Sequence, residues 1–484
     1  MIAMTRRQFV RRSCVGAAAA FAPRADASKA RRPNIVFICT DDQAPWALRY
    51  GGNADAVTPN LDRFCAQGAY LPNFFVTTPV CSPSRASTMT SRYGTEVGIT
   101  DWLHAGGGKL VDETDIGIES RFPTWPERLQ RAGYDTALVG KWHLGVLDKF
   151  HPTKRGYRYF AGFRGGGVAP VDAELEVDGK TSKCPGITDD NLTNFAVDYL
   201  KTRDRSQPFL LNVHYRWPHA PWQPLPEDDW APYKDKTVPI PNPDYPGLDT
   251  ERVQKFMKEY LSACNGVDRN IGRVLAAIDA LGLADNTIVV CTSDNGYNMG
   301  HNGIWHKGNG HWILNSTRDL PGDDERTARP NMYDNSLRVP TAVRWPGVTQ
   351  AGSRIGETVT ILDWFPTLCA AAGARVPRFK TIRGRDFAPL LHGENSEWDN
   401  DLYAEYSQHH YTKADLRMYR TPEWKLIRDF LRPGKDELYH LAEDPAEHHN
   451  LIDELEYAPI REELNKRLLA QMKKLHDPVL QRRT

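Results

Sequence analysis

The chain has 484 residues, which is long enough to bury a large hydrophobic core and to form more than one folded unit. Its 61 Lys and Arg residues balance 61 Asp and Glu residues, and this zero net charge argues against binding to nucleic acid or to an acidic membrane by bulk charge. With 34 Pro and 13 Trp residues, the composition is typical of a loop-rich enzyme and not of a helical bundle.

Residues 1–30 have the organisation of an export signal. Thr5-Arg6-Arg7-Gln8-Phe9-Val10 precedes a weakly apolar run, residues 15–22, and Ala25-Asp26-Ala27 fits a small-residue cleavage site. The paired arginines resemble a bacterial twin-arginine signal, and the alternative is an accidental pair in a basic tail. No later run reaches the roughly 18 apolar residues of a membrane span. We therefore expect a soluble exported protein, periplasmic or secreted.

Apolar segments over residues 34–40, 135–140, 208–215 and 287–292 predict strands that are buried on both faces. A further strand is predicted over 338–343, and helices are predicted from 58, over 123–132, 188–200, 251–281 and 362–372. This alternation predicts an α/β fold with a mostly parallel sheet over residues 31–380. Polar residues follow each of the four buried strands, which is where catalytic groups gather in such sheets.

The pattern changes near residue 381. Short strand-like pieces over 424–428 and 437–441 precede a charged helix over 453–475. We predict a small C-terminal α+β subdomain over 381–484, with an antiparallel sheet and a packed helix.

Cys81-Ser82-Pro83-Ser84-Arg85 reads as a loop that turns into a helix. Pro83 suits a first helical turn, and Cys81 would lie at the helix N-terminus, where negative charge is favoured. Arg85 follows four residues later, on the same helix face. Short motifs also match by chance. Taken alone, this segment is explained equally well by a buried cysteine next to an arginine that forms a surface salt bridge.

This segment resembles the signature of the type I sulfatases, which belong to the alkaline-phosphatase-like superfamily. Lys141-Trp142-His143-Leu144-Gly145 and Ser293-Asp294-Asn295-Gly296, with Lys307 after them, resemble further family signatures in the family's order. The resemblance implies a large central mixed, mostly parallel sheet flanked by helices. It also implies that a formylglycine-generating enzyme oxidises Cys81 to formylglycine (3-oxoalanine), whose hydrated aldehyde is the nucleophile.

Metal ligands are expected at two strand ends. Asp41, Asp42, Asp294 and Asn295 offer only oxygen atoms, and an oxidised Cys81 would add another. Hard oxygen ligands favour Ca²⁺ or Mg²⁺ over zinc. The resemblance implies the same ligand set, usually with Ca²⁺.

Lys141, His143, His219 and Lys307 form a predicted cationic ring for the sulfate group. Arg85 would hold one hydroxyl of the aldehyde hydrate and His143 the other. His219, or a lysine, is the expected acid for the leaving alcohol. His214 is the rival histidine, although its place at a strand end favours a structural role. An aldehyde hydrate can release sulfate by losing the proton of its second hydroxyl, whereas an adduct on plain Ser or Cys cannot.

The expected reaction is hydrolysis of a sulfate monoester, with a sulfated carbohydrate or small molecule as the substrate. The alternatives are a phosphomonoester, phosphodiester or phosphonate hydrolase of the same superfamily, or a non-catalytic carbohydrate-binding relative. Residues 311–330 are an insertion that would either wall the substrate pocket or form a surface loop. The oligomeric state stays open. Substrate binding is predicted for His301 and His214, and sugar contacts are also considered for Trp305, His306, Trp312, His409, His410 and Tyr411.

Overall fold

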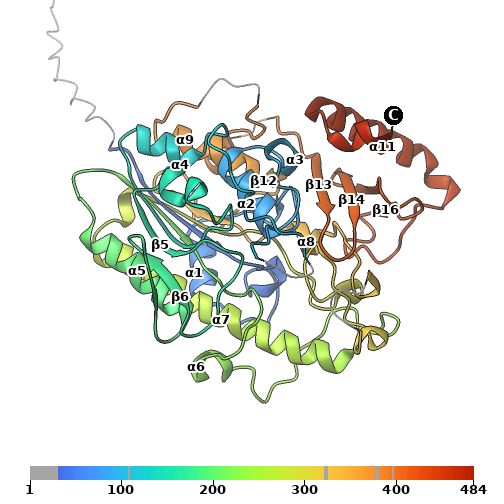
Figure 1. Ribbon diagram of the computed structural model, residues 1–484, viewed down its shortest axis with the longest axis horizontal. Coiled ribbons are helices and arrows are strands. Elements are labelled where there is room, and N and C mark those ends of the chain that lie inside the picture. Colours follow the sequence, from blue (N-terminus) through green and yellow to red (C-terminus); the bar gives the residue numbers. More distant parts are fainter. Residues whose placement is uncertain (1–30, 107–109, 321–324, 377–380, 395–396, 484) are drawn as a thin grey trace, which may run out of the picture.

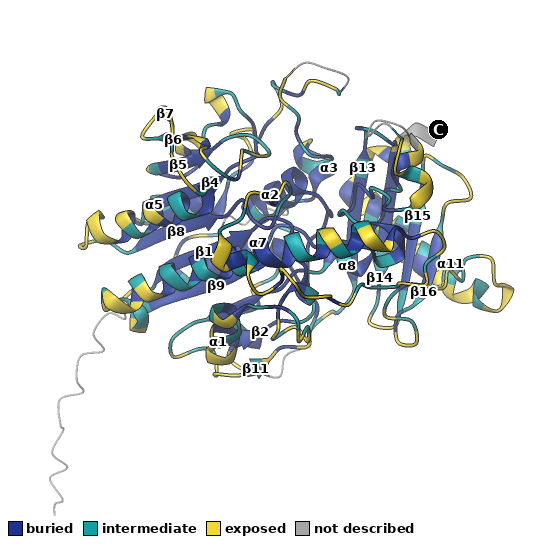
Figure 2. Ribbon diagram, turned by 90° about the horizontal axis from the view of Figure 1, so that it is seen from below, coloured by how far each residue is buried: buried dark blue, intermediate teal, exposed yellow. Residues whose placement is uncertain are grey.

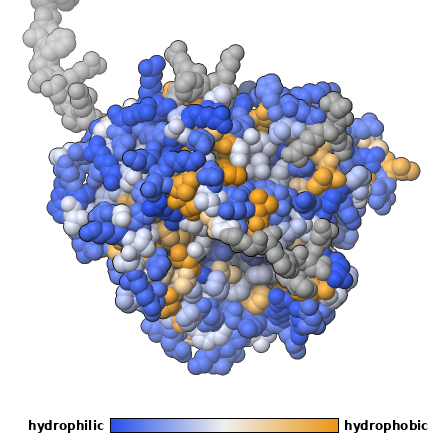
Figure 3. Space-filling model, viewed as in Figure 1, coloured by the Kyte–Doolittle hydropathy of each residue, from blue (hydrophilic) through white to orange (hydrophobic). Residues whose placement is uncertain are grey.

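The computed structural model describes residues 31–106, 110–320, 325–376, 381–394 and 397–483 (Figure 1). The predicted export signal lies outside these residues. Within the described residues, no helix is both long and apolar enough to cross a membrane. Hydrophilic side chains cover most of the face in Figure 3, and apolar ones gather there only in small groups.

A ten-stranded sheet forms the main body, in the order β11-β2-β10-β9-β1-β8-β4-β5-β6-β7. Strands β9, β1, β8, β4 and β5 at its centre run parallel, whereas β10, β6 and β7 pair antiparallel with their neighbours. The predicted mixed, mostly parallel α/β sheet is therefore confirmed. The strands are β1 (Asn34–Thr40), β2 (Ala69–Tyr70), β4 (Asp135–Lys141), β5 (Tyr159–Phe163), β6 (Glu174–Val177), β7 (Lys180–Lys183), β8 (Phe209–His214), β9 (Thr287–Ser293), β10 (Ala342–Arg344) and β11 (Ser353–Arg354).

Helices cover both faces of this sheet (Figures 1 and 2). Side chains of β1 alternate between the faces, so that Phe37 joins one buried cluster and Ile38 joins the other. On the Ile38 face lie α1 (Pro59–Gln67), α5 (Thr188–Thr202) and α7 (Thr250–Ala280). On the Phe37 face lie α2 (Cys81–Thr90), α4 (Trp125–Arg131) and α9 (Trp364–Ala371).

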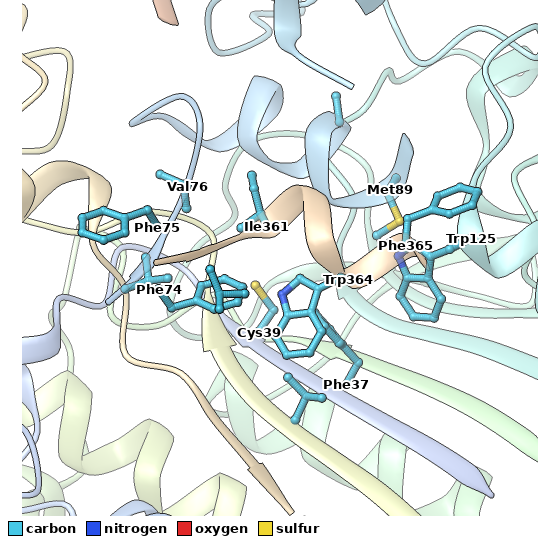
Figure 4. Close-up of a cluster of buried hydrophobic side chains, with 14 of the residues drawn as sticks. Phe37, Cys39, Phe74, Phe75, Val76, Met89, Trp125, Ile361, Trp364 and Phe365 are labelled. Carbon is cyan, nitrogen blue, oxygen red and sulfur yellow. The ribbon is translucent and has the colours of Figure 1, made fainter. Parts of the chain in front are cut away.

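Aromatic packing fixes the Phe37 face (Figure 4). The Phe37 ring meets the Trp364 ring edge-on, with centroids 5.4 Å apart, and lies 5.8 Å from Trp125. Met89 of α2 belongs to the same buried cluster. These contacts hold α2 against the sheet, and they therefore set where the first residue of α2, Cys81, lies.

The C-terminal part contains a four-stranded antiparallel sheet and a packed helix, as predicted. Its strands are β13 (Leu402–Gln408), β14 (Ala414–Arg420), β15 (Trp424–Asp429) and β16 (Glu437–His440). Helix α11 (Ala458–Leu475) buries Leu468 and Met472 against it. Because Tyr406 and Met418 of this sheet join the main hydrophobic cluster, packing continues across residue 381, and the domain boundary there stays a prediction.

Two sequence expectations differ from the structure. The strand expected over 338–343 is limited to β10, because Pro340 has no backbone N–H to offer a neighbouring strand. The terminal helix begins at 458 and not at 453, because residues 455–457 form a separate 3₁₀ turn before it. The remaining short strands and α-helices are β3 (Phe74–Phe75), β12 (Val359–Thr360), α3 (Gly94–Val97), α6 (Glu227–Trp230), α8 (Asp334–Leu337) and α10 (Ala388–Leu391).

Candidate active site

The predicted site residues meet at one edge of the large sheet. Strands β1, β9, β4 and β8 are parallel, so their carboxyl ends lie together, and the loops that follow them carry the polar residues. Helix α2 begins at the same edge with Cys81, which is 2 % exposed. The backbone N–H of Asp294 donates to the carbonyl of Thr40, which ties the ends of β9 and β1 together.

Two strand ends supply a group of acidic side chains. Asp41 and Asp42 follow β1, and Asp294 and Asn295 follow β9. Asp42 adopts a left-handed backbone conformation with φ of 70°, and its N–H donates to Oδ1 of Asp294 over 3.2 Å. Asn295 Nδ2 donates to Asp42 Oδ1 over 2.7 Å. The unusual backbone at Asp42 thus brings carboxylates from two strands into contact.

Cys81 lies between this acidic group and a lysine. Its Sγ is 3.5 Å from Asp41 Oδ1 and 2.8 Å from Nζ of Lys307. One turn further along α2, the Nε of Arg85 donates to Oδ2 of Asp294 over 2.8 Å. The helical spacing predicted for Cys81 and Arg85 therefore places both residues against the same acidic group.

Cations balance the buried carboxylates. Lys141 Nζ lies 2.6 Å from Asp41 Oδ2, and Lys307 pairs with Asp42. Burial has the largest single effect on the Asp41 carboxyl and raises its pKa, but Lys141, His219 and Arg85 together outweigh burial and the pKa falls to about 2. Burial raises the pKa of the Cys81 thiol by more than Lys141 and Lys307 lower it, so this pKa rises to about 12. As an unmodified thiol, Cys81 would therefore be protonated and a poor nucleophile at neutral pH.

Of the three histidines that lie at or just after the ends of β4 and β8, His143 and His219 line the cavity and His214 does not. His143 Nε2 donates to the carbonyl of Leu103 over 2.9 Å, and its Nδ1 is buried without a partner among the described residues. His219 Nδ1 donates to the carbonyl of Ala220, and its Nε2 is 3.9 Å from Asp42 Oδ2. Burial lowers the pKa of both imidazoles, although Asp41 opposes this effect at His219.

The acidic group fits a divalent cation. Ligand atoms of Asp41, Asp42, Cys81 and Asp294 all lie within 4.8 Å of one another, and all four residues are buried. Asp42 Oδ2 and Asn295 Oδ1 are buried oxygens with no hydrogen-bond partner among the described residues. Buried carboxylate and amide oxygens without partners are costly unless they bind a cation. An oxygen-rich set of this kind suits Ca²⁺ or Mg²⁺.

Of the predicted site residues, Cys81, His143, His219 and Lys307 line a cavity of about 500 Å³. Aromatic rings form one wall of the cavity. The ring centroids of Trp102 and Tyr411 are 6.1 Å apart, and those of Tyr411 and His311 are 5.3 Å apart. Tyr411 is one of the sugar contacts considered from the sequence, and Trp102 is not. The cavity is lined by Cys81, Trp102, Leu103, His104, Ala105, Glu113, Ile116, His143, Gly145, Val146, Arg164, Gly165, Gly166, Gly167, His219, His306, Lys307, Asn309, His311 and Tyr411.

The Arg164–Gly167 segment was also missed, although it follows β5 as the other site residues follow their strands. A Cβ at Gly166 would stand 2.7 Å from His143 Nε2, so only glycine permits this approach. At Gly165 and Gly167 a Cβ would meet open space, which leaves the cavity wide. The segment could have been found from the sequence if residues 159–163 had been predicted as a strand, because Arg164 directly follows them.

A polar network supports the aromatic wall. Glu113 accepts hydrogen bonds from His409 Nε2 at 2.9 Å and from His410 Nε2 at 3.0 Å. Asp101 accepts from the backbone N–H groups of Trp102 and His409. His409 and His410 therefore hold the cavity wall in place from behind, and only the neighbouring Tyr411 lines the cavity.

The other considered residues separate into two groups. His306 lines the cavity, and so does His311, so the start of the 311–330 insertion walls the pocket. His301 packs beside Trp46, with ring centroids 6.2 Å apart, and does not line the cavity. His214 is buried under the site, where its Nδ1 lies 3.1 Å from the Lys141 carbonyl. Substrate contact by His301 or His214 stays a prediction that no described contact supports.

Two family models match the chain. The sulfatase model matches residues 33–374, and the model of the C-terminal region of N-sulphoglucosamine sulphohydrolase matches residues 326–474. The first spans the described site from Asp41 to Lys307.

Curated relatives and solved structures agree with these models. An N-acetylglucosamine-6-O-sulfatase of Bacteroides thetaiotaomicron is 27 % identical over 92 % of this chain and 87 % of its own length. Human N-acetylgalactosamine-6-sulfatase is 30 % identical over 74 % of this chain and 66 % of its own. A protein solved in complex with its substrate D-glucosamine-2-N,6-O-disulfate has the same fold, with a TM-score of 0.78, 24 % identity and coverage of 93 % and 99 %. The chain belongs to the sulfatase family of sulfuric ester hydrolases.

Proposed function

We propose that this sulfatase hydrolyses sulfate monoesters of carbohydrates, with formylglycine formed from Cys81 as the nucleophile. The observation that carries the proposal is the position of Cys81, which faces the cavity while in contact with Asp41 and Lys307. The aromatic wall of Trp102 and Tyr411 supports a sugar as the bound group, because sugar rings present apolar C–H faces. Relatives named for N-acetylglucosamine and N-acetylgalactosamine sulfates support the same substrate class.

The high pKa of the Cys81 thiol favours modification over direct thiolate chemistry. A formylglycine-generating enzyme is the maturation partner that this proposal requires. Hydrated formylglycine supplies a hydroxyl nucleophile, and a divalent cation polarises sulfate oxygens and lowers the pKa of a hydroxyl that it binds. Asp41, Asp42, Asp294 and Asn295 would hold that cation, which we propose to be Ca²⁺, with Mg²⁺ as the alternative.

The chain's own residues bind the anion and move protons. Lys307 lines the cavity and presents its ammonium group to the sulfate oxygens, and Lys141, paired with Asp41, adds positive charge to the same buried site, where charge interactions are strong. Arg85, held by Asp294, orients the group at position 81. Because His143 Nε2 donates to Leu103, its Nδ1 is the atom that accepts a proton during turnover.

His219 is the proposed acid for the leaving alcohol. Its Nδ1–H is engaged by the Ala220 carbonyl, so Nε2 is the nitrogen that carries the transferable proton. His219 lines the cavity, and His214 does not. The nearby carboxylates of Asp41 and Asp42 favour the protonated ring that this role needs, in opposition to burial.

The test combines a substrate panel with analysis of position 81. Purified protein is assayed against sulfated monosaccharides and oligosaccharides and against matched phosphate esters, and the tryptic peptide that contains residue 81 is examined by mass spectrometry. We expect sulfate release to exceed phosphate release, and we expect formylglycine in active protein. Full activity with an unmodified Cys81 thiol would refute the mechanism, and faster phosphate release would favour a phosphohydrolase.

We also propose export through the twin-arginine pathway to the periplasm or beyond. The basis is the Arg6-Arg7 pair with the apolar and small residues that follow it. Replacing both arginines with lysine should retain the protein inside the cell, and fractionation of wild-type and variant cells measures this. Unchanged export of the variant would contradict the proposal.

A further inference from the structure

A second cavity, of about 290 Å³, adjoins the catalytic cavity. His311 and Tyr411 line both cavities, and their ring centroids are 5.3 Å apart, so the two cavities share this pair as a wall. The volume is near the lower end of the roughly 300–1,000 Å³ usual for ligand sites. Its other lining residues are Arg252, Trp305, Trp312, Thr317, Arg318, Leu320 and Thr327.

Two tryptophans give this cavity the character of a sugar site. Trp305 packs against Phe256, with ring centroids 5.2 Å apart, and Trp312 lies 6.5 Å from Tyr245. Neither indole N–H has an acceptor among the residues that the structure describes. Aromatic faces beside free N–H donors match the C–H faces and hydroxyl oxygens of a sugar ring.

The two arginines of the cavity differ in their charge partners. Arg318 forms a two-pronged ion pair with Asp249, through Nε at 2.8 Å and Nη2 at 2.6 Å. Arg252 lies over the Phe256 ring at 5.2 Å, and no carboxylate of the described residues is within 4 Å of its guanidinium. Asp249 is 1 % exposed and is already occupied by Arg318, so no carboxylate of the described residues compensates the positive charge of Arg252.

We propose that the second cavity is a subsite for an anionic sugar unit, which neighbours in an oligosaccharide the unit whose sulfate ester is cleaved. Arg252 binds the sulfate or carboxylate of that neighbouring unit, because a guanidinium fork matches the paired oxygens of either group. Trp305 and Trp312 contact its ring. This inference rests on the proposed function and deepens it: the enzyme selects sulfated oligosaccharides with charge on two adjacent units.

The test measures a ratio of specificities. The substrates are an aryl sulfate and three disaccharides with one sulfated hexosamine, whose second unit carries a carboxylate, a sulfate or a neutral alcohol. We expect wild-type protein to prefer a charged second unit, and Arg252→Ala to lower kcat/KM for it relative to the aryl sulfate by about ten-fold, as for a lost charge-assisted hydrogen bond. The preferred disaccharide distinguishes a carboxylate from a sulfate.

Two variants serve as controls. Arg252→Lys keeps the charge and should restore part of the preference. Lys255→Ala removes one positive charge from an exposed position on the same helix, α7, outside both cavities, and should leave the ratio within about two-fold.

Binding provides a readout that does not depend on turnover. Calorimetry with the Cys81→Ala protein and the same disaccharides should show tighter binding of the charged ones, and Arg252→Ala should remove this difference. If Arg252→Ala changes neither the kinetic ratio nor the binding difference, the subsite is refuted even if sulfated sugars are hydrolysed. If no sulfate ester is hydrolysed but Arg252 still controls binding, the proposed function fails and the subsite stands.

Discussion

Two clusters of buried charge in this protein have similar composition but different surroundings. At the edge of the large sheet, Asp41 and Asp42 pair with Lys141 and Lys307. Where the C-terminal sheet meets the main body, Lys425 Nζ lies 2.5 Å from Asp334 Oδ1 and 2.6 Å from Glu447 Oε1, and Arg420 lies 3.0 Å from Asp334 Oδ2. Burial raises the pKa of Glu447 to about 7, so both clusters contain perturbed groups.

The difference lies in what remains unpaired. In the C-terminal cluster, the charged atoms of Asp334, Lys425 and Glu447 all have hydrogen-bond partners, and none of the three residues lines either cavity described above. In the first cluster, Asp42 Oδ2 lacks a hydrogen-bond partner among the described residues, and Lys307 faces a cavity. Perturbed pKa values alone therefore do not identify a functional site, whereas unpaired atoms beside a cavity do.

Substituting a cavity residue should separate activity from stability most clearly. We expect Cys81→Ala to lower kcat/KM by at least about 10³-fold, because it removes the nucleophile, while unfolding free energy changes by about 1 kcal/mol. Sulfate release and chemical denaturation measure the two effects. Cys39→Ala, which removes a buried thiol of β1 outside the cavity, is the matched control and should keep activity. Comparable losses in both variants would contradict the assignment of Cys81.

The C-terminal cluster should show the opposite behaviour. Lys425→Met leaves the buried carboxylate of Glu447 without its cation and leaves Asp334 with Arg420 alone, so it should lower the unfolding free energy by about 3–5 kcal/mol. The kcat of the protein that remains folded should stay within about two-fold, since the cluster is away from the cavity. Lys234→Met breaks an exposed pair with Glu227 and should cost less than about 1 kcal/mol. A selective loss of kcat in Lys425→Met would give this cluster a catalytic role.

The two histidines near β8 test the comparison within the site itself. His219→Ala should lower kcat by about 10²-fold or more for alkyl sulfates, whose leaving groups need a proton, and much less for activated aryl sulfates. His214→Ala should lower mainly the thermal stability, because its buried ring contacts Lys141 and Phe37. If the leaving-group dependence follows His214, the acid has been assigned to the wrong histidine.

Metal removal should affect only the first cluster. A chelator should abolish activity and lower the unfolding free energy by about 2.7 kcal/mol if the ion had been present at about 100 times its Kd. Thermal unfolding of wild-type and Asp42→Asn proteins, with and without chelator, measures this, and the variant should respond less. Recovery with Zn²⁺ but with neither Ca²⁺ nor Mg²⁺ would contradict an oxygen-ligand site.

Local sequence patterns predicted the central strands of the large sheet. The buried strands that became β1, β4, β8 and β9 were readable because both of their faces are apolar, and polar residues at their ends marked the edge where the site lies. Strands β13 and β14 were not predicted. Their buried faces include polar side chains such as Arg417, whose partner Asp477 lies 60 residues away, so no local periodicity reveals them.

The sequence by itself determined the helical register of Cys81 and Arg85 and the oxygen character of the Asp41, Asp42, Asp294 and Asn295 set. Tertiary structure alone decided which histidine reaches the cavity, that Trp102 and Gly165–Gly167 shape it, and that Arg252 has no carboxylate partner within the described ranges. The physical reason is the separation along the chain of the residues on which each property depends. Helical register and ligand chemistry depend on neighbouring residues, whereas burial and charge balance depend on segments that only folding brings together.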